Sequence, residues 1–169
     1  MSKVTSKWSA VNCFKEHAYI CALSLDCPTH TKSKGECPAT WTYFERTHSC
    51  YKIFHWKSQT NAEIFCEEQR SHLASIHSID ENNFIVELSL SDAPYSEKTW
   101  IGLRDLRRPT GTSEYSWMDG TQLDYVIWER YVSVNASRCI AISTDAFYWV
   151  EHDCNQLSAF VCKRPAKVG

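Results

Sequence analysis

Residues 149–162 read WVEHDCNQLSAFVC: a tryptophan, four residues, a cysteine, seven residues and a second cysteine. The same spacing occurs in residues 8–21, which read WSAVNCFKEHAYIC. In both stretches an aromatic residue stands two positions before the last cysteine, and a β-branched residue directly precedes it. Such self-similarity predicts two copies of one structural unit. We therefore expect the end of one domain, a linker and then one whole domain.

This interpretation divides the 169 residues into four segments. Residues 1–22 are expected to be the C-terminal remnant of a preceding domain, and residues 23–36 a linker without periodicity. Residues 37–164 form the complete domain, followed by a tail at 165–169. Because the remnant lacks the rest of its core, it is predicted to pack poorly.

The nine cysteines predict an oxidising compartment, since disulfides rarely persist in the cytosol. The residues after Met1 form no apolar signal sequence, so we expect the signal peptide of a secreted or membrane-anchored protein to have been lost by truncation. No apolar run is long enough to span a membrane. The net charge of −2 gives no electrostatic basis for binding nucleic acid.

The hydrophobic pattern predicts helices and short strands in an α+β arrangement. One helix is expected to begin at a capping box, Thr60 to Glu63, and to end near Arg70; a second box, Ser78 to Glu81, starts another helix. A long loop without periodicity is expected at 121–137. Strands are predicted in residues 41–56, 99–103, 115–117, 138–143, 147–151 and 159–163.

Seven short motifs occur in a fixed order along the chain. They are Cys37-Pro-Ala-Thr-Trp41, Cys50-Tyr51, Ala62…Cys66, Leu73-Ala-Ser-Ile76, Trp100-Ile-Gly-Leu103, Trp117-Met-Asp-Gly120 and Trp149…Cys154…Cys162. With these motifs the chain resembles a long-form C-type lectin-like domain over residues 37–164. The resemblance implies two helices, short antiparallel sheets and a long loop, held by disulfides. It makes this domain the second of at least two tandem copies, the first being truncated.

The resemblance also implies three disulfides: Cys37–Cys50, Cys66–Cys162 and Cys139–Cys154. From the residues alone, six cysteines allow fifteen pairings, so the sequence does not fix this set. The partners of three N-terminal cysteines stay open: Cys13, Cys21 and Cys27. A zinc site is a weaker alternative, because the gaps between its candidate ligands are larger and less regular than structural zinc sites use. Those candidates are Cys13, Cys21, Cys27, Cys37, His17 and His30.

Sugar-binding members of this family hold Ca²⁺ with a Glu-Pro-Asn or Gln-Pro-Asp triplet, an acidic residue before the penultimate cysteine and a Trp-Asn-Asp triplet. Here the loop reads WERYVSVNASRC, without proline, and Arg138 precedes Cys139. Val150 and Glu151 follow Trp149 in place of Asn and Asp. Calcium needs a cage of several oxygens, which Glu151 and Asn135 alone do not supply. We therefore expect no cofactor and no calcium.

The resemblance places the recognition surface on residues 121–137 and 148–151. The candidate ligand-binding residues there are Glu129, Arg130, Tyr131, Asn135, Tyr148 and Glu151. Asn135 also begins an N-glycosylation sequon, and whether it is used stays open. Arg104, Arg107 and Arg108 offer a second candidate site for an anionic ligand, although a solvated loop is the favoured explanation of these residues.

We expect a non-catalytic, extracellular recognition module whose partner is a glycan or glycoprotein. The alternative is a calcium-dependent carbohydrate-binding lectin with unusual site residues. An enzyme is not expected, because no Ser-His-Asp or Cys-His motif is visible. His152 and Asp153 stand beside Glu151, but neighbours on a strand point to opposite faces and do not form an acid–base cluster.

Overall fold

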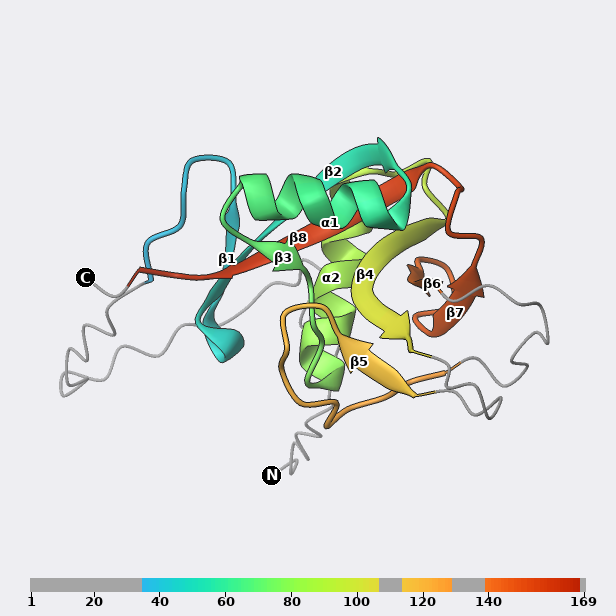
Figure 1. The fold of residues 1–169 in the computed structure, drawn as a ribbon. Coiled ribbons are helices and arrows are strands. Elements are labelled where there is room, and N and C mark those ends of the chain that lie inside the picture. The colour runs from blue at the N-terminus through green and yellow to red at the C-terminus, as the bar shows by residue number, and fades with distance from the viewer. Residues whose placement is uncertain (1–34, 107–113, 129–138, 168–169) are drawn as a thin grey trace, which may run out of the picture. The chain divides into compact units, whose positions relative to one another are not determined.

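In a computed structural model the chain divides into two compact units, Met1–Thr31 and Lys32–Gly169. The structure describes residues 35–106, 114–128 and 139–167, all within the second unit (Figure 1). None of the described helices is long and apolar enough to cross a lipid bilayer. The elements are β1 (Thr42–Phe44), a 3-10 turn (Glu45–Thr47), β2 (Ser49–Lys57), α1 (Gln59–Glu68), β3 (His72–Leu73), α2 (Ile79–Asp92), β4 (Lys98–Asp105), β5 (Tyr115–Trp117), β6 (Cys139–Ser143), β7 (Trp149–His152) and β8 (Ser158–Pro165).

The strands form one sheet in the order β1-β2-β8-β4-β6-β7, with β3 paired to β8 and β5 to β4. All pairs are antiparallel except β4 and β8, which run parallel. The long antiparallel pair β2–β8 forms the centre of one half of the sheet (Figure 1). The strands expected at 99–103, 115–117 and 159–163 are present as β4, β5 and β8.

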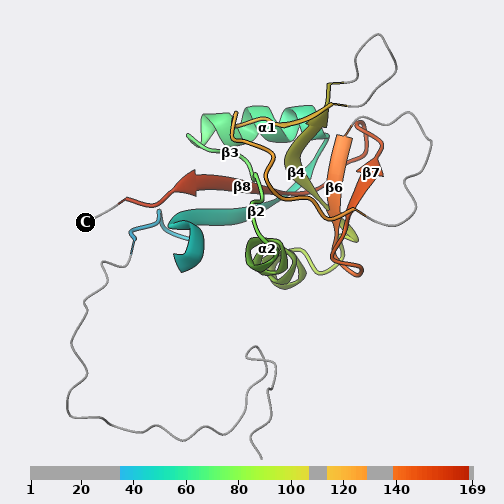
Figure 2. The same cartoon turned by 90° about the horizontal axis from the view of Figure 1, so that it is seen from below.

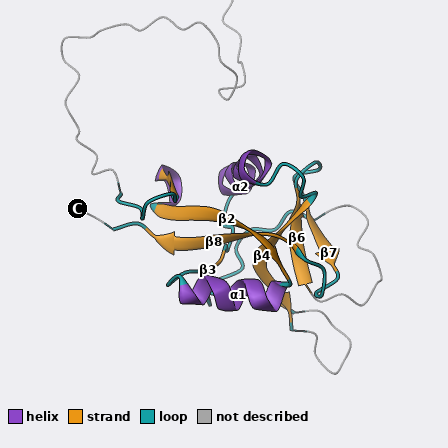
Figure 3. Cartoon of the chain, turned by 90° about the horizontal axis from the view of Figure 1, so that it is seen from above, coloured by secondary structure: helices purple, strands orange, loops and turns teal. Residues whose placement is uncertain are grey.

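The two helices lie on opposite faces of the β2–β8 pair (Figures 2 and 3). Alternate side chains of a strand point to opposite faces, so each helix covers its own set. Tyr51 and Ile53 of β2 pack in one cluster with Ile85 of α2. Phe160 of β8 packs in the other cluster with Ala62 of α1. The expected α+β arrangement with two helices is thereby confirmed.

Helix α2 begins as predicted. The Ser78 hydroxyl accepts a hydrogen bond from the backbone N–H of Glu81 at 3.2 Å, which satisfies one of the free donors at the helix start. Of the apolar residues in this helix, Ile85 is fully buried, and Phe84 and Leu88 pack partly buried against the core.

The capping box predicted at Thr60 is wrong. Helix α1 begins one residue earlier, at Gln59, and its cap residue Ser58 makes no side-chain hydrogen bond. Glu63 does not reach back to Thr60; its carboxylate accepts instead from the backbone N–H of Leu73 at 2.8 Å. A tertiary contact to the segment after the helix therefore takes the carboxylate that the local pattern assigned to the cap.

All three disulfides implied by the resemblance are confirmed. Their Cα atoms are 5.6 Å apart in Cys37–Cys50, 5.5 Å in Cys66–Cys162 and 5.2 Å in Cys139–Cys154. The long Cys66–Cys162 loop restricts the unfolded chain most, which is worth somewhat under 5 kcal/mol in the chain-entropy model. Because Cys37 is bonded to Cys50, it is removed from the set of candidate zinc ligands.

Gln59 ties helix α1 to an irregular part of the sheet. The register between β4 and β6 shifts between Trp100 and Arg104. Near this shift the side-chain amide of Gln59 lies 3.1 Å from three backbone carbonyl oxygens. Buried carbonyl groups require donors, and Gln59 supplies them where the ladder is irregular. The carbonyls belong to Ile101, Leu103 and Ile140.

A buried polar cluster, which we call the Glu81 node, lies between α2 and the β2–β8 pair. The Glu81 side chain is fully buried, and its Oε1 atom accepts from Lys163 Nζ at 2.7 Å and from the Tyr51 hydroxyl at 2.6 Å. Its Oε2 atom accepts from the backbone N–H of His77 at 2.9 Å. Lys163 also donates to the carbonyl oxygen of Ser75 at 3.0 Å. Burial, and then the neighbouring carboxylate, raise the pKa of Tyr51, so its hydroxyl remains a donor.

Candidate ligand-binding site

Two of the six predicted ligand-binding residues can be placed in the structure. Glu151 lies within β7, which is the edge strand of the sheet, and Tyr148 directly precedes this strand. The Tyr148 side chain is 43% exposed, and Glu151 is half-buried. The other four residues lie outside the described part of the chain: Glu129, Arg130, Tyr131 and Asn135.

Asn82 of α2 binds the β6–β7 hairpin on both sides of Tyr148. A turn at residues 144–146 connects β6 to β7. The Asn82 side chain, which is fully buried, donates to the carbonyl oxygen of Phe147 at 2.9 Å and accepts from the indole N–H of Trp149 at 2.9 Å. Phe147 has a positive φ of 63°, a conformation that side chains rarely adopt. Asn82 therefore holds both sides of Tyr148 in place.

Trp149 also anchors the first part of the predicted long loop. Its ring is fully buried and meets three other rings edge to face, with centroids 5.3 to 5.8 Å away. The backbone N–H of Trp149 donates to Ile127 at 2.8 Å. Residues 121–127 have no regular secondary structure, as predicted, yet they are tied to β7 by these contacts. The three rings belong to Trp117, Tyr125 and Trp128.

A hollow of about 300 Å³ opens beside β7, and we call it the β7 hollow. Its rim carries three carboxylates, one ammonium group and the hydroxyl of Ser143. Such a mixture suits a ligand rich in hydroxyl or amide groups, because both hydrogen-bond donors and acceptors are offered. The lining residues are Glu97, Lys98, Ser143, Asp145, Ala146, Val150 and Glu151.

Charges in and near the β7 hollow are set by their neighbours. The Ser143 hydroxyl donates to the Asp145 carboxylate, and this bond lowers the pKa of Asp145, which therefore stays ionised. Below the hollow, burial lowers the pKa of His152, and the positive charge of Lys98 lowers it further. The His152 ring is therefore neutral at pH 7 and lies against the Trp100 ring, tilted by 38° with centroids 4.8 Å apart.

On β7, Val150 and Glu151 stand where calcium-binding members of the resembled family have Asn and Asp. Val150 packs, partly buried, against the hydrophobic cluster under α1 and offers no oxygen to a metal. Among the described residues, one group of three side chains has its ligand atoms within 4.8 Å of one another: Glu63, Glu67 and His72. This group lies on α1 and β3, away from β7, and no sequence pattern predicted it. The three carboxylates of the β7 hollow do not form such a group.

The structure describes some residues of the two other groups that the sequence analysis considered as sites. Arg104 of β4 is exposed and lies 3.4 Å from the hydroxyl of Ser116, whereas Arg107 and Arg108 lie outside the described residues. His152 contacts the hydroxyl of Ser158 at 3.1 Å, while the Asp153 carboxylate accepts from a backbone N–H in its own turn. The two side chains thus have different hydrogen-bond partners.

Sequence reasoning did not find Asn82, Lys98 or Asp145 as parts of this surface. Asp145 lies between the strands predicted at 138–143 and 147–151, so its place beside β7 could have been inferred from those two ranges. Lys98 reaches the hollow because β4 pairs with β6, where it lies opposite Ser143. Asn82 belongs to a helix 65 residues away from Phe147 in sequence, and no local pattern signals that contact.

Comparison with known proteins gives a consistent result. The model of the Lectin C-type domain family matches residues 55–164. Struthiocalcin-2 from Struthio camelus is 36% identical over 144 residues, covering 78% of this chain and 98% of its own. Snaclec 5 from Bitis arietans is 40% identical over 140 residues, covering 80% of this chain and 87% of its own.

Solved structures agree with the sequence relatives. Human lithostathine, at 23% identity, shares the fold with a TM-score of 0.68 over 76% of this chain and 99% of its own. The carbohydrate-recognition domain of cow CD23, solved with a GlcNAc2Man3 oligosaccharide, is 30% identical with a TM-score of 0.67, covering 79% and 98%. A calcium-independent type II antifreeze protein is 27% identical with a TM-score of 0.65, covering 78% and 96%.

Proposed function

The chain belongs to the C-type lectin domain family, and from this membership we propose that it is an extracellular recognition module. It binds a glycan or a protein ligand without the calcium-dependent sugar site of the family. The three disulfides of the domain support an extracellular location, since such bonds persist in oxidising compartments. One similar structure is called a carbohydrate-recognition domain, and another is called a calcium-independent protein.

The observation that carries the proposal is the position of Val150. In this family a metal-binding carboxamide is expected at that place on β7, and here an aliphatic side chain packs against the hydrophobic core. Its neighbour Glu151 keeps one carboxylate, but a calcium ion takes six to eight oxygen ligands. The β7 hollow instead offers fixed hydrogen-bonding groups, held by the Ser143 hydroxyl and by the hairpin that Asn82 anchors.

We place the ligand surface on Tyr148, Glu151 and the β7 hollow, together with Glu129, Arg130 and Tyr131 of the long loop. Exposed tyrosine and arginine side chains are the types that contribute most to binding interfaces. A glycan on Asn135 would cover part of this surface. We therefore expect glycosylation there to weaken binding by exclusion.

The test of calcium use is a glycan array and a thermal melt, each with millimolar Ca²⁺ and again with a chelator. The proposal expects the same bound glycans and the same melting temperature in both conditions. A melting temperature that calcium raises, and that Glu151→Ala returns to its calcium-free value, would instead establish the calcium-dependent lectin.

The test of the surface uses whichever array glycan binds best. Tyr148→Ala, Arg130→Ala and Tyr131→Ala should each weaken its binding, and Asn135→Gln should strengthen it when the protein is made in cells that glycosylate. Ile64→Ala, an exposed apolar residue on α1, is the control and should bind like the parent. If every variant binds like the control, the ligand site lies elsewhere on the domain.

A further inference from the structure

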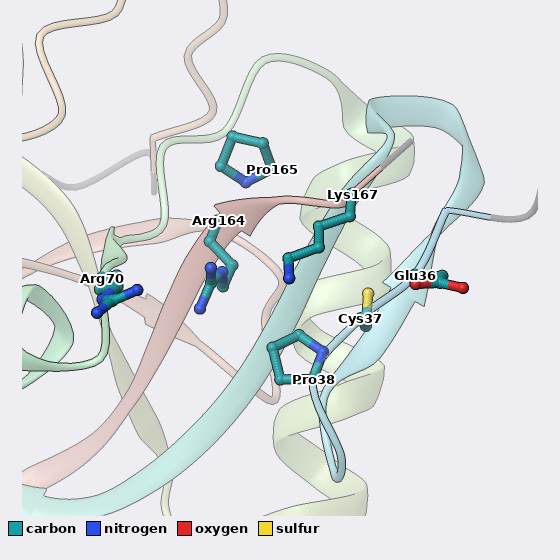
Figure 4. Close-up of a pocket in the computed structure, with 7 residues that line it drawn as sticks. All are labelled: Glu36, Cys37, Pro38, Arg70, Arg164, Pro165 and Lys167. Carbon is teal, nitrogen blue, oxygen red and sulfur yellow. The ribbon is translucent and has the colours of Figure 1, made fainter. Parts of the chain in front are cut away.

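A second pocket, at the other end of the sheet order from β7, collects positive charge (Figure 4). It has a volume of about 340 Å³ and shares no residue with the β7 hollow. It lies where the end of β8, the turn after α1 and the segment before β1 meet. We call it the cationic pocket; its lining residues are Glu36, Cys37, Pro38, Arg70, Arg164, Pro165 and Lys167.

The cationic pocket holds three positive side chains and one carboxylate. In Figure 4 the side chains of Arg164 and Lys167 both extend toward the open space, and Glu36 lies at the opposite end from Arg70. Among the described residues, none of the three cations makes an ion pair. Like charges gathered without a counter-ion repel one another, and an anion in the pocket would relieve that repulsion.

The backbone around the cationic pocket fixes where these charges lie. Glu36 and Lys167 exchange two backbone hydrogen bonds of 2.9 and 3.0 Å, and the adjacent Cys37 is bonded to Cys50 of β2. Arg70 follows α1 with a positive φ of 56°, so the chain turns sharply there. Arg164 donates one N–H to the carbonyl oxygen of Gln69 at 3.2 Å, which orients its guanidinium group.

Arginine is suited to oxyanions because its planar group presents five N–H donors in a fixed fork. Arg164 uses one of these donors for Gln69 and keeps the others for a ligand. A pocket of this size accepts a tetrahedral anion together with part of the molecule that carries it. We propose that the cationic pocket binds a sulfate or phosphate group, with Arg70, Arg164 and Lys167 as its ligands.

The experiment is calorimetric titration of the whole chain at low salt with three probes: inorganic sulfate, inorganic phosphate and a sulfated heparin oligosaccharide. Saturable binding of at least one probe is expected. Arg70→Gln and Lys167→Gln should each weaken it about tenfold, the usual scale for one charge-assisted contact. Binding of the oligosaccharide alone identifies a sulfated glycan as the source, and binding of the free ions shows that the group itself suffices.

Arg46→Gln is the matched control, because it removes the same charge from an exposed arginine that lies outside the pocket and pairs with Asp80. It should bind like the parent, and circular dichroism should show that all variants are folded. The proposal is overturned if no probe binds saturably, or if Arg46→Gln weakens binding as much as Arg70→Gln. Tyr148→Ala separates this site from the β7 surface, since it should leave binding of these probes unchanged.

Discussion

The Glu81 node holds one carboxylate and the β7 hollow three, and the two regions differ in what surrounds those groups. Glu81 is fully buried, and its two oxygens accept from Lys163, Tyr51 and a backbone N–H. Asp145 and Glu97 in the β7 hollow are exposed side chains at the edge of the sheet. The protein itself supplies the partners of the first carboxylate. The second set lies at the surface, where it can reach the ligand that we propose for this site.

The largest expected effect is that of Lys163→Met, which removes the ammonium group from the Glu81 node but keeps an unbranched side chain. We expect a loss of about 3–5 kcal/mol in the free energy of unfolding, because Glu81 stays buried without its cation. Urea unfolding measures the loss. Arg46→Met is the control, since the exposed Arg46–Asp80 pair should be worth less than about 1 kcal/mol. Equal losses in the two variants would mean that Glu81 finds other partners.

The second prediction concerns the link between helix α2 and the recognition surface. Asn82→Ala leaves the indole N–H of Trp149 and the carbonyl of Phe147 without their partner, and we expect a loss of about 2–4 kcal/mol. Its neighbour Asn83 is half-buried, so Asn83→Ala should stay within about 1 kcal/mol. Thermal melts followed by tryptophan fluorescence distinguish the two. If the two variants have the same melting temperature, Asn82 does not hold the hairpin in place.

The third prediction sharpens the contrast at β7. Tyr148→Ala should change the free energy of unfolding by no more than about 0.5 kcal/mol, because the side chain lies largely in solvent. The same variant should weaken ligand binding, as proposed above. A large loss of stability in urea would show instead that Tyr148 is part of the core.

The smallest expected effect is a dependence of stability on pH through His152. Burial lowers its pKa in the folded protein, so the unfolded chain binds the proton more readily. Stability should therefore fall as the pH drops below about 6.5, the ordinary value for histidine, toward the lower folded pKa. Urea melts at several pH values between 7.5 and 5 measure this fall, which should be shallower in His152→Asn. Identical pH profiles for parent and variant would contradict it.

Much of the fold could be predicted because the motifs report contacts that recur wherever this domain forms. Cys66 falls on the inner side of a helical stripe, and its bond to Cys162 then fixes the helix against the last strand. The buried run at Trp100 to Leu103 became β4 because only apolar side chains fit between two covered faces.

The rest could not be predicted, because it depends on register and on long-range polar contacts. Gln59 reaches carbonyl groups up to 81 residues away, and they accept it only because β4 and β6 shift register there. Glu63 was assigned to a cap and instead contacts Leu73. At the candidate site, Glu151 lies in the strand expected at 147–151 and Tyr148 directly precedes β7, while their role in binding stays a prediction. The β7 hollow beside them could not be predicted, because Lys98 reaches it only through the pairing of β4 with β6.

The positions of two disulfides determine how this domain responds to mechanical force. Cys37 is joined to Cys50, and Cys66 to Cys162, across separations of 13 and 96 residues. A pull applied to the chain on both sides of the domain passes through the first bond, along β2 and α1, and through the second bond into the end of β8. The segment between Cys66 and Cys162 is bypassed and cannot be stretched while the bonds are intact. The β7 hollow lies within that segment, so a ligand held there would stay bound to an unloaded surface while the domain transmits tension.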